Sequence, residues 1–266
     1  MEVLGRDSIV HLIFSPTICP KLQLPDVLIM AKSSGFSRIQ LERLGSASSP
    51  VQNDTSVSMV RDRLDAAMIK LSGLTVRSLT GRKADSDERN LIYNLRQIEW
   101  DIHLARALRT KNIALSGGDE GPEAFEDLIE GIGILISQIP DVSIRLMNKS
   151  GSCFNNLQDA QEILSKVDDP RFQIRIDANE LLICGEDVIE YTSAIGDRIG
   201  EVAIRCGNDT EFGDLGYNEE LMDRFIARLK DLNFMGSLIV QGNPSPIQEG
   251  VDLLQSVREN IQKMIN

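Results

Sequence analysis

The chain has 266 residues, 42% of them hydrophobic, so it can bury a sizeable core, and its composition does not indicate disorder or a disulfide scaffold. Its 40 acidic and 28 basic residues give a formal net charge of −12, which disfavours phosphate backbones, so we expect no nucleic-acid partner. No stretch approaches the roughly 18 apolar residues of a membrane span, and we expect no membrane association. The cysteines Cys19, Cys153, Cys184 and Cys206 form no CxxC pair, which favours reduced thiols and a cytoplasmic location.

Short β-rich runs alternate with segments of helical periodicity along the whole chain. Runs of this length and composition are typical of strands, and helices between them imply parallel βαβ units. We expect eight strands, at Ile9–Phe14, Arg38–Glu42, Thr75–Leu79, Asn112–Ser116, Ser143–Met147, Gln173–Asp177, Glu201–Arg205 and Ser237–Gln241.

Apolar residues at helical spacing predict the intervening helices. Leu91, Leu95, Ile98, Ile102 and Ala105 share one face of a helix, and Leu221, Phe225, Leu229 and Leu232 share one face of another. The remaining signals mark helix ends and packing: Pro122 in a first turn, Asn218 as an N-cap, Gly35-Phe36 and Asn233-Phe234 as terminating turns, and Trp100 packed against a neighbouring helix.

Eight βα units in a chain of this length favour closure into a single (β/α)8 barrel, which typically takes about 250 residues. We therefore predict an α/β protein with one domain over residues 1–266. An open doubly wound sheet is the alternative. No GxGxxG follows the first strand, so the dinucleotide-binding fingerprint of such sheets is missing.

Charged residues alternate along the last strands and are expected to point into the barrel. Arg145, Arg175 and Arg205 fall on this face together with Asp177 and Glu201. Buried arginines need partners, so one interpretation is an ion network that fills the barrel. The other is that some of these arginines bind a carboxylate or phosphate of a ligand, with Arg205 nearest the rim as the best candidate.

The order of short motifs at the strand ends resembles the xylose-isomerase-like superfamily of sugar isomerases and epimerases. The motifs are Gly35-Phe36 followed by Ile39-Gln40-Leu41, then Met147-Asn148, then Asp177 with Glu180, and finally Gln241. The resemblance covers nearly the whole chain and implies a TIM barrel with its site at the carboxyl ends of the strands. It also implies a small sugar ligand and an association of copies into a homo-oligomer.

The family's metal ligands correspond to Met147, Asp177, Ala203 and Gln241 in this sequence, and of these only Asp177 is a carboxylate. Glu180 stands where the family has a histidine beside Asp177, and Gln40 replaces its glutamate on strand two. Cations such as Mn²⁺, Mg²⁺ or Zn²⁺ prefer carboxylates and imidazoles. The only histidines are His11, expected to be a hydrogen-bonded core residue, and His103 in a helix. We therefore expect no cofactor, unless Asp177, Glu180 and Glu201 build a different metal site.

Two functions follow from this pattern. The first is an isomerase or epimerase acting on a polyol, keto sugar or sugar acid, with Asp177 or Glu180 as the base and Arg205 as an electrostatic clamp. The second is a non-catalytic barrel that binds an anionic sugar or a partner protein. In either case the expected ligand contacts are Arg205, Arg145, Arg175, Gln40, Asn148 and Gln241.

Overall fold

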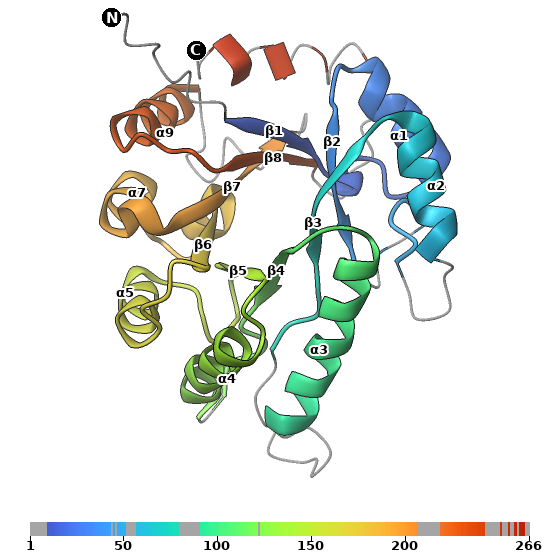
Figure 1. Ribbon diagram of the computed structural model, residues 1–266. Helices are drawn as coiled ribbons and strands as arrows, with labels where there is room; N and C mark the ends of the chain where they lie inside the picture. Colours follow the sequence, from blue (N-terminus) through green and yellow to red (C-terminus); the bar gives the residue numbers. More distant parts are fainter. Residues whose placement is uncertain are drawn as a thin grey trace, which may run out of the picture.

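A computed structural model describes residues 10–43, 45, 47–51, 57–79, 91–121, 123–206, 219–242, 251, 255, 258–259 and 261–263. Eight parallel strands pair in chain order, and β8 pairs with β1 to close the barrel. Helices surround the strands, as Figure 1 shows. The predicted (β/α)8 barrel is confirmed.

Seven strands lie where the sequence predicts them, apart from shifts of a residue or two at their ends. Ile9, the first residue of the predicted first strand, lies outside the described residues. The observed strands are β1 (His11–Phe14), β2 (Arg38–Glu42), β4 (Asn112–Ser116), β5 (Ser143–Met147), β6 (Phe172–Asp177), β7 (Ile199–Cys206) and β8 (Ser237–Gly242).

The third strand was predicted wrongly: β3 spans Lys70–Thr75, and the predicted run Thr75–Leu79 follows it. β3 contains Gly73, and a side chain would be crowded at this position because a Cβ there would lie 3.1 Å from Oε1 of Gln40 inside the barrel. The β2–β3 register shifts at the same point, between Ile39 and Gln40. The backbone N–H groups of Val76 and Leu79 still donate hydrogen bonds to carbonyl oxygens of β4, at 2.8 and 3.0 Å, which explains their strand-like pattern.

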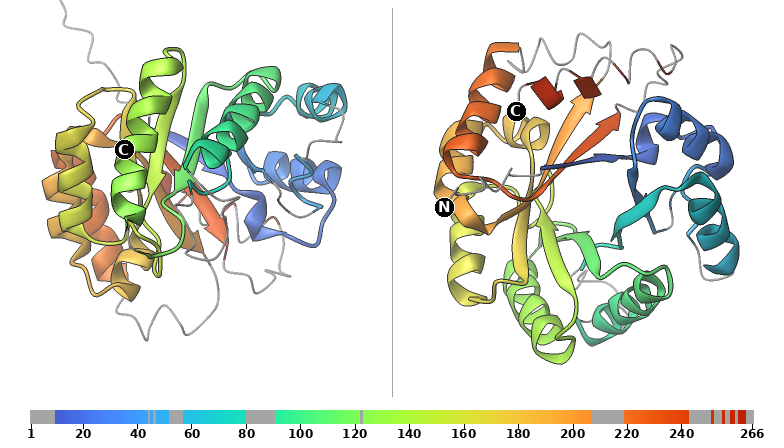
Figure 2. Two further views of the ribbon diagram at one scale, coloured as in Figure 1. Left: turned by 90° about the horizontal axis from the view of Figure 1, so that it is seen from below. Right: turned by 45° about the horizontal axis from the view of Figure 1, so that its top comes forward.

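The helices lie outside the strands in both views of Figure 2. They are α1 (Leu24–Ser33), α2 (Val57–Ala67), α3 (Leu91–Ala107), α4 (Ala124–Gln138), α5 (Leu157–Lys166), α6 (Ala178–Ile183), α7 (Val188–Ile195) and α9 (Glu219–Asp231).

The predicted turns at Gly35 and Asn233 are confirmed. Both residues adopt the left-handed conformation that ends a helix, with φ of +81° and +53°. Pro122 and Asn218, predicted at helix starts, lie outside the described residues. In the described part of the chain, no helix is long and apolar enough to cross a membrane.

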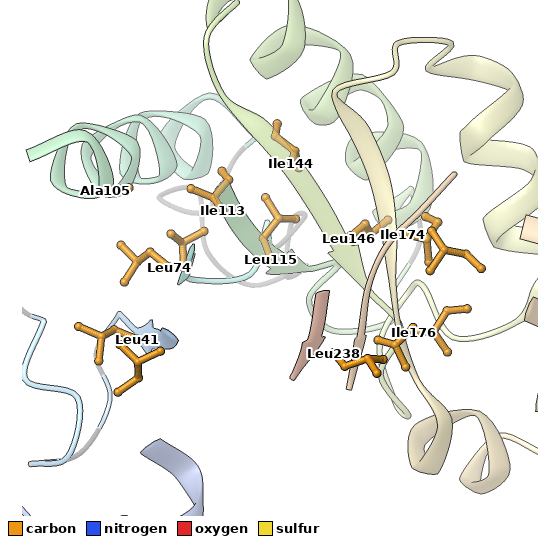
Figure 3. Close-up of a cluster of buried hydrophobic side chains, with 14 of the residues drawn as sticks. Leu41, Leu74, Ala105, Ile113, Leu115, Ile144, Leu146, Ile174, Ile176 and Leu238 are labelled. Atoms are coloured by element: carbon orange, nitrogen blue, oxygen red, sulfur yellow. The ribbon is translucent and has the colours of Figure 1, made fainter. Parts of the chain in front are cut away.

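The main hydrophobic core lies between the barrel and its helices. Alternate strand residues such as Leu41, Leu74, Ile113 and Ile144 are buried in it, and Figure 3 shows several of them together with Ala105 of α3. Trp100 does not join this layer, because its side chain is 70% exposed on α3, and the expected packing was wrong.

The barrel interior has a different character. Small or aliphatic residues such as Ala114, Ala203 and Ile239 are buried there, together with the charged side chains of Arg175 and Glu201. Polar residues therefore extend from the middle of the barrel to its carboxyl-terminal mouth.

Candidate functional site

Three predicted site residues meet at the carboxyl ends of β6, β7 and β8. Arg205 pairs with Gln241 across β7 and β8, and Asp177 pairs with Ala203 across β6 and β7. Their side chains all fall on the inner face because strand residues alternate. The mouth is also where barrels of this kind place their chemistry.

Asp177 uses both carboxylate oxygens within the protein. Oδ1 accepts from the backbone N–H groups of Asn179 and Glu180, at 3.1 and 3.3 Å, and so caps α6. Oδ2 accepts from Arg205 Nη2 at 3.1 Å and from Gln241 Nε2 at 2.7 Å. The cap fixes the side chain, and the two donors hold it facing the neighbouring strands.

Glu180 projects from α6 and is held as firmly. Its Oε1 accepts from Arg205 Nη2 at 2.6 Å, and its Oε2 accepts from the backbone N–H and the hydroxyl of Ser150, at 2.9 and 2.8 Å. Burial opposes ionisation, but the Ser150 hydrogen bonds and the Arg205 charge outweigh it and lower the pKa of Glu180. Glu180 is therefore ionised at neutral pH.

Arg205 bridges the two carboxylates with its Nε and Nη2 atoms. Its side chain is 21% exposed, and in the described part of the chain its Nη1 donates to no group. Nη1 is therefore the guanidinium nitrogen that no described residue engages.

A second network fills the barrel below. Arg145 Nη1 lies 3.0 Å from Oε1 of Glu201, and Arg175 Nη1 lies 3.9 Å from Oε2 of the same residue. Arg175 also donates to Gln241 Oε1 at 2.9 Å. With its amide oriented to match its neighbours, Gln40 donates to Glu201 at 3.2 Å and accepts from Arg175 at 3.0 Å. The network connects the middle of the barrel to the mouth through Gln241.

Asn148 joins β5 to β6. Its Oδ1 accepts from the backbone N–H of Asp177 at 2.8 Å, and its Nδ2 donates to the carbonyl of Asp177 at 3.2 Å. The Asn148 side chain is buried, and in the described structure it positions the backbone of Asp177. Its contact with a ligand stays a prediction.

Glu42 ends β2. Its position two residues after Gln40 puts it on the inner face of the barrel, toward the mouth. Burial raises the pKa of Glu42, against the opposing charge of Arg175. In the described part of the chain its carboxylate accepts no hydrogen bond from another residue. Of the three carboxylates Glu42, Asp177 and Glu180, Glu42 alone accepts no hydrogen bond from a described residue.

A further charged cluster beside the mouth was missed. Asp101 of α3 is fully buried and accepts from Arg43 at 2.9 Å and from Arg77 at 2.7 and 3.2 Å. The two arginines follow the ends of β2 and β3. An acidic residue beside the apolar face of the predicted helix was the available signal.

The positions at which the resemblance implies metal ligands offer few donor atoms for a divalent cation in the described part of the chain. Met147 and Ala203 offer no oxygen or nitrogen side-chain donor, and Asp177 is engaged as described above. Among the described residues, no group of three His, Cys, Asp or Glu side chains could hold a metal ion. Glu201, considered for a different site, is ion-paired with Arg145 instead.

The comparisons with known proteins agree with this architecture. A family model described as the xylose isomerase-like TIM barrel matches residues 28–257. No curated protein sequence matches the chain significantly.

Solved structures resemble the chain over nearly its whole length. An L-ribulose 3-epimerase superposes with a TM-score of 0.76 at 12% identity, covering 97% of this chain and 95% of its own. A D-allulose 3-epimerase from Methylomonas sp. gives 0.75 at 15% identity, with coverages of 96% and 98%. The IOLI protein, in a structure with a bound zinc atom, gives the same values. At these identities the likeness shows the fold.

Proposed function

Because the chain belongs to the xylose isomerase-like TIM barrel family, we propose that it is a sugar isomerase- or epimerase-like protein that takes a small polyol, keto sugar or sugar acid at its mouth without a divalent metal ion. We further propose that residues 1–266 fold as this one domain. The sugar epimerases among the similar structures support the ligand class.

The observation that carries the proposal is the position of Arg205. Its guanidinium lies between Asp177 and Glu180, at the strand ends where the family places its metal. A permanent cation there can polarise a carbonyl or bind a carboxylate, and Nη1, which donates to no described residue, supplies the hydrogen-bond donors for it. Gln241 and Arg175 extend the donor surface into the barrel. Arg205 would thus supply the positive charge that a metal ion supplies elsewhere.

The first experiment is calorimetric titration of EDTA-treated protein with manganese, followed by keto sugars and sugar acids. We expect no manganese binding and saturable binding of at least one sugar acid. Arg205→Lys keeps the charge but loses the fork, and should weaken binding about tenfold or more, since a charged hydrogen bond contributes about 1.5–3 kcal/mol. Arg109→Lys, at an exposed pair, is the matched control. Manganese binding at one site per chain would refute the metal-free proposal.

The alternative of a non-catalytic binding barrel is favoured by a specific observation. The lone pairs of Asp177 and Glu180 are engaged by Arg205, Ser150, Gln241 and the α6 backbone, so neither carboxylate is poised as a base. A catalytic role would instead fall to Glu42, whose pKa is raised and whose carboxylate accepts no hydrogen bond from the described residues.

Proton exchange in D2O separates the two functions. An isomerase or epimerase that works by proton transfer exchanges the hydrogen at the carbon beside the carbonyl of a bound keto sugar for deuterium, and NMR detects this without knowledge of the product. We expect Glu42→Gln to abolish the exchange, and Glu180→Gln to retain part of it. Ligands that bind with no exchange in the wild type would identify a binding protein.

A further inference from the structure

A polar cavity lies at the amino-terminal end of the barrel, opposite the mouth. It has a volume of about 180 Å³ and lies where β1 and β2 begin, beside helical residues near the end of the chain. We call it the floor pocket, and its polar lining comes from His11, Ser37, Arg38, Arg258 and Gln262.

The floor pocket gathers positive charge in an acidic protein. Arg38 and Arg258 line it, and Lys70 is the strand neighbour of Arg38 across β2 and β3. No carboxylate of the described residues forms an ion pair with any of the three. The whole chain has a formal charge of −12, so an unneutralised cationic group of this kind is a local exception.

The backbone holds Arg258 in place. A Cβ built on Gly35 would lie 2.8 Å from both Cζ and Nε of Arg258, so the guanidinium packs directly on the glycine. Gly35 also needs its φ of +81° to end α1, and both demands select glycine. Arg258 Nη1 donates to Gln262 Oε1 at 3.2 Å, and its Nε is buried and donates to none of the described residues.

His11 contributes a polar group without adding charge. Its Nε2 lies 3.5 Å from Nη2 of Arg38. Burial, followed by the charges of Arg38 and Lys70, lowers the pKa of His11, so the ring is neutral at pH 7. A neutral imidazole accepts at one nitrogen and donates at the other, and can orient a ligand beside the two arginines.

We propose that the floor pocket binds a small oxyanion of the phosphate type. Guanidinium forks match the geometry of phosphate oxygens, and here two of them converge with no counterion from the described chain. The cavity is smaller than the roughly 300 Å³ at which sites for drug-sized ligands begin, which restricts the ligand to a few heavy atoms. The site is independent of the sugar-binding mouth.

The test is calorimetric titration of the full chain with sodium phosphate, against sodium chloride of equal ionic strength. We expect saturable binding of one phosphate per chain to the wild type, and at least a tenfold loss of affinity in Arg38→Gln and in Arg258→Gln. Lys166→Gln removes one exposed charge on α5 and should bind as the wild type does. If Arg38→Gln fails to fold, Arg258→Gln decides. No saturable phosphate binding, or an equal loss in Lys166→Gln, would overturn the proposal.

NMR of the imidazole groups gives a second readout. The chain has only two histidines, so a His103→Asn variant assigns the His11 signal. An anion in the floor pocket opposes the field of Arg38 and Lys70, and should raise the pKa of His11 in phosphate relative to chloride. An unchanged His11 titration in saturating phosphate would place the anion elsewhere and refute the assignment.

Discussion

Asp101 shows how much a single buried charge can matter in this fold. It is fully buried on α3 and pairs with Arg43, whose side chain is 1% exposed, and with the partly exposed Arg77. Asp101→Asn removes the buried negative charge that Arg43 and Arg77 share, so we expect a loss of about 3–5 kcal/mol in the free energy of unfolding. Urea denaturation measures it. Asp65→Asn, in an exposed pair with Arg109, is the control and should cost less than about 1 kcal/mol.

Glu42 should make stability depend on pH. Its folded-state pKa is raised by burial, so the folded protein binds this proton more tightly than the unfolded chain does. Glu42 therefore supports folding at low pH, and this contribution is lost as the pH rises through the folded pKa. We expect Glu42→Gln to be more stable than the wild type at pH 7, with a smaller advantage at pH 4.

Urea denaturation of both proteins at the two pH values tests this. Glu162→Gln, on an exposed position of α5, is the control and should change stability by less than about 0.5 kcal/mol at either pH. A Glu42→Gln advantage that grows toward pH 4 would contradict the prediction.

Two glycines, one in a strand and one in a helix, separate the effect of steric packing from the effect of backbone conformational preference. A Cβ on Gly73 of β3 would lie 3.1 Å from Gln40 Oε1 and 3.3 Å from the Asn112 carbonyl oxygen, whereas a Cβ on Gly133 of α4 meets nothing within 4 Å. Gly73→Ala should destabilise the barrel by about 1–3 kcal/mol through overpacking. Gly133→Ala should stabilise it by about 0.5–1 kcal/mol because alanine favours the helix. Thermal or urea unfolding of the two variants should give opposite signs.

The same glycine explains where sequence patterns stop being informative. Strands such as β4 and β5 were predicted because β-rich composition and helices on both sides are local signals. The β3 sequence contains Ser72 and Gly73, and glycine is a residue type depleted in strands. The glycine is explained by the close approach of Gln40, which lies on β2. Contacts between residues that are far apart in the sequence leave no signal in a local sequence pattern.

The candidate site divides in the same way. Strand alternation placed Asp177, Arg205 and Gln241 on one face, and the structure brings them together. Ser150, which follows β5, donates hydrogen bonds to Glu180 on α6. The Asn148 side chain is hydrogen-bonded to the backbone of Asp177. These partners decide that the two carboxylates hold Arg205, and the sequence alone could not reveal them.

At the scale of the whole molecule, the barrel separates two polar ends. Arg38 at the floor and Glu42 at the mouth begin and end the same strand, about 13 Å apart at the usual rise of a strand. Between them lies the interior network of Gln40, Glu201 and Arg145, which ion pairs and hydrogen bonds hold together and which reaches the mouth through Arg175 and Gln241. Perturbations at such separations usually add independently, within about 0.5 kcal/mol.

We therefore expect each end to bind its ligand without sensing the other. Phosphate affinity at the floor pocket should be the same in Glu42→Gln as in the wild type, within the roughly twofold range that corresponds to 0.5 kcal/mol. Conversely, Arg258→Gln should leave sugar binding at the mouth unchanged. Calorimetry of both ligands on both variants completes the comparison. If Glu42→Gln shifts phosphate affinity tenfold, the two ends are coupled and the prediction of independent sites is refuted. The interior network of charged side chains would then be the candidate connection between them.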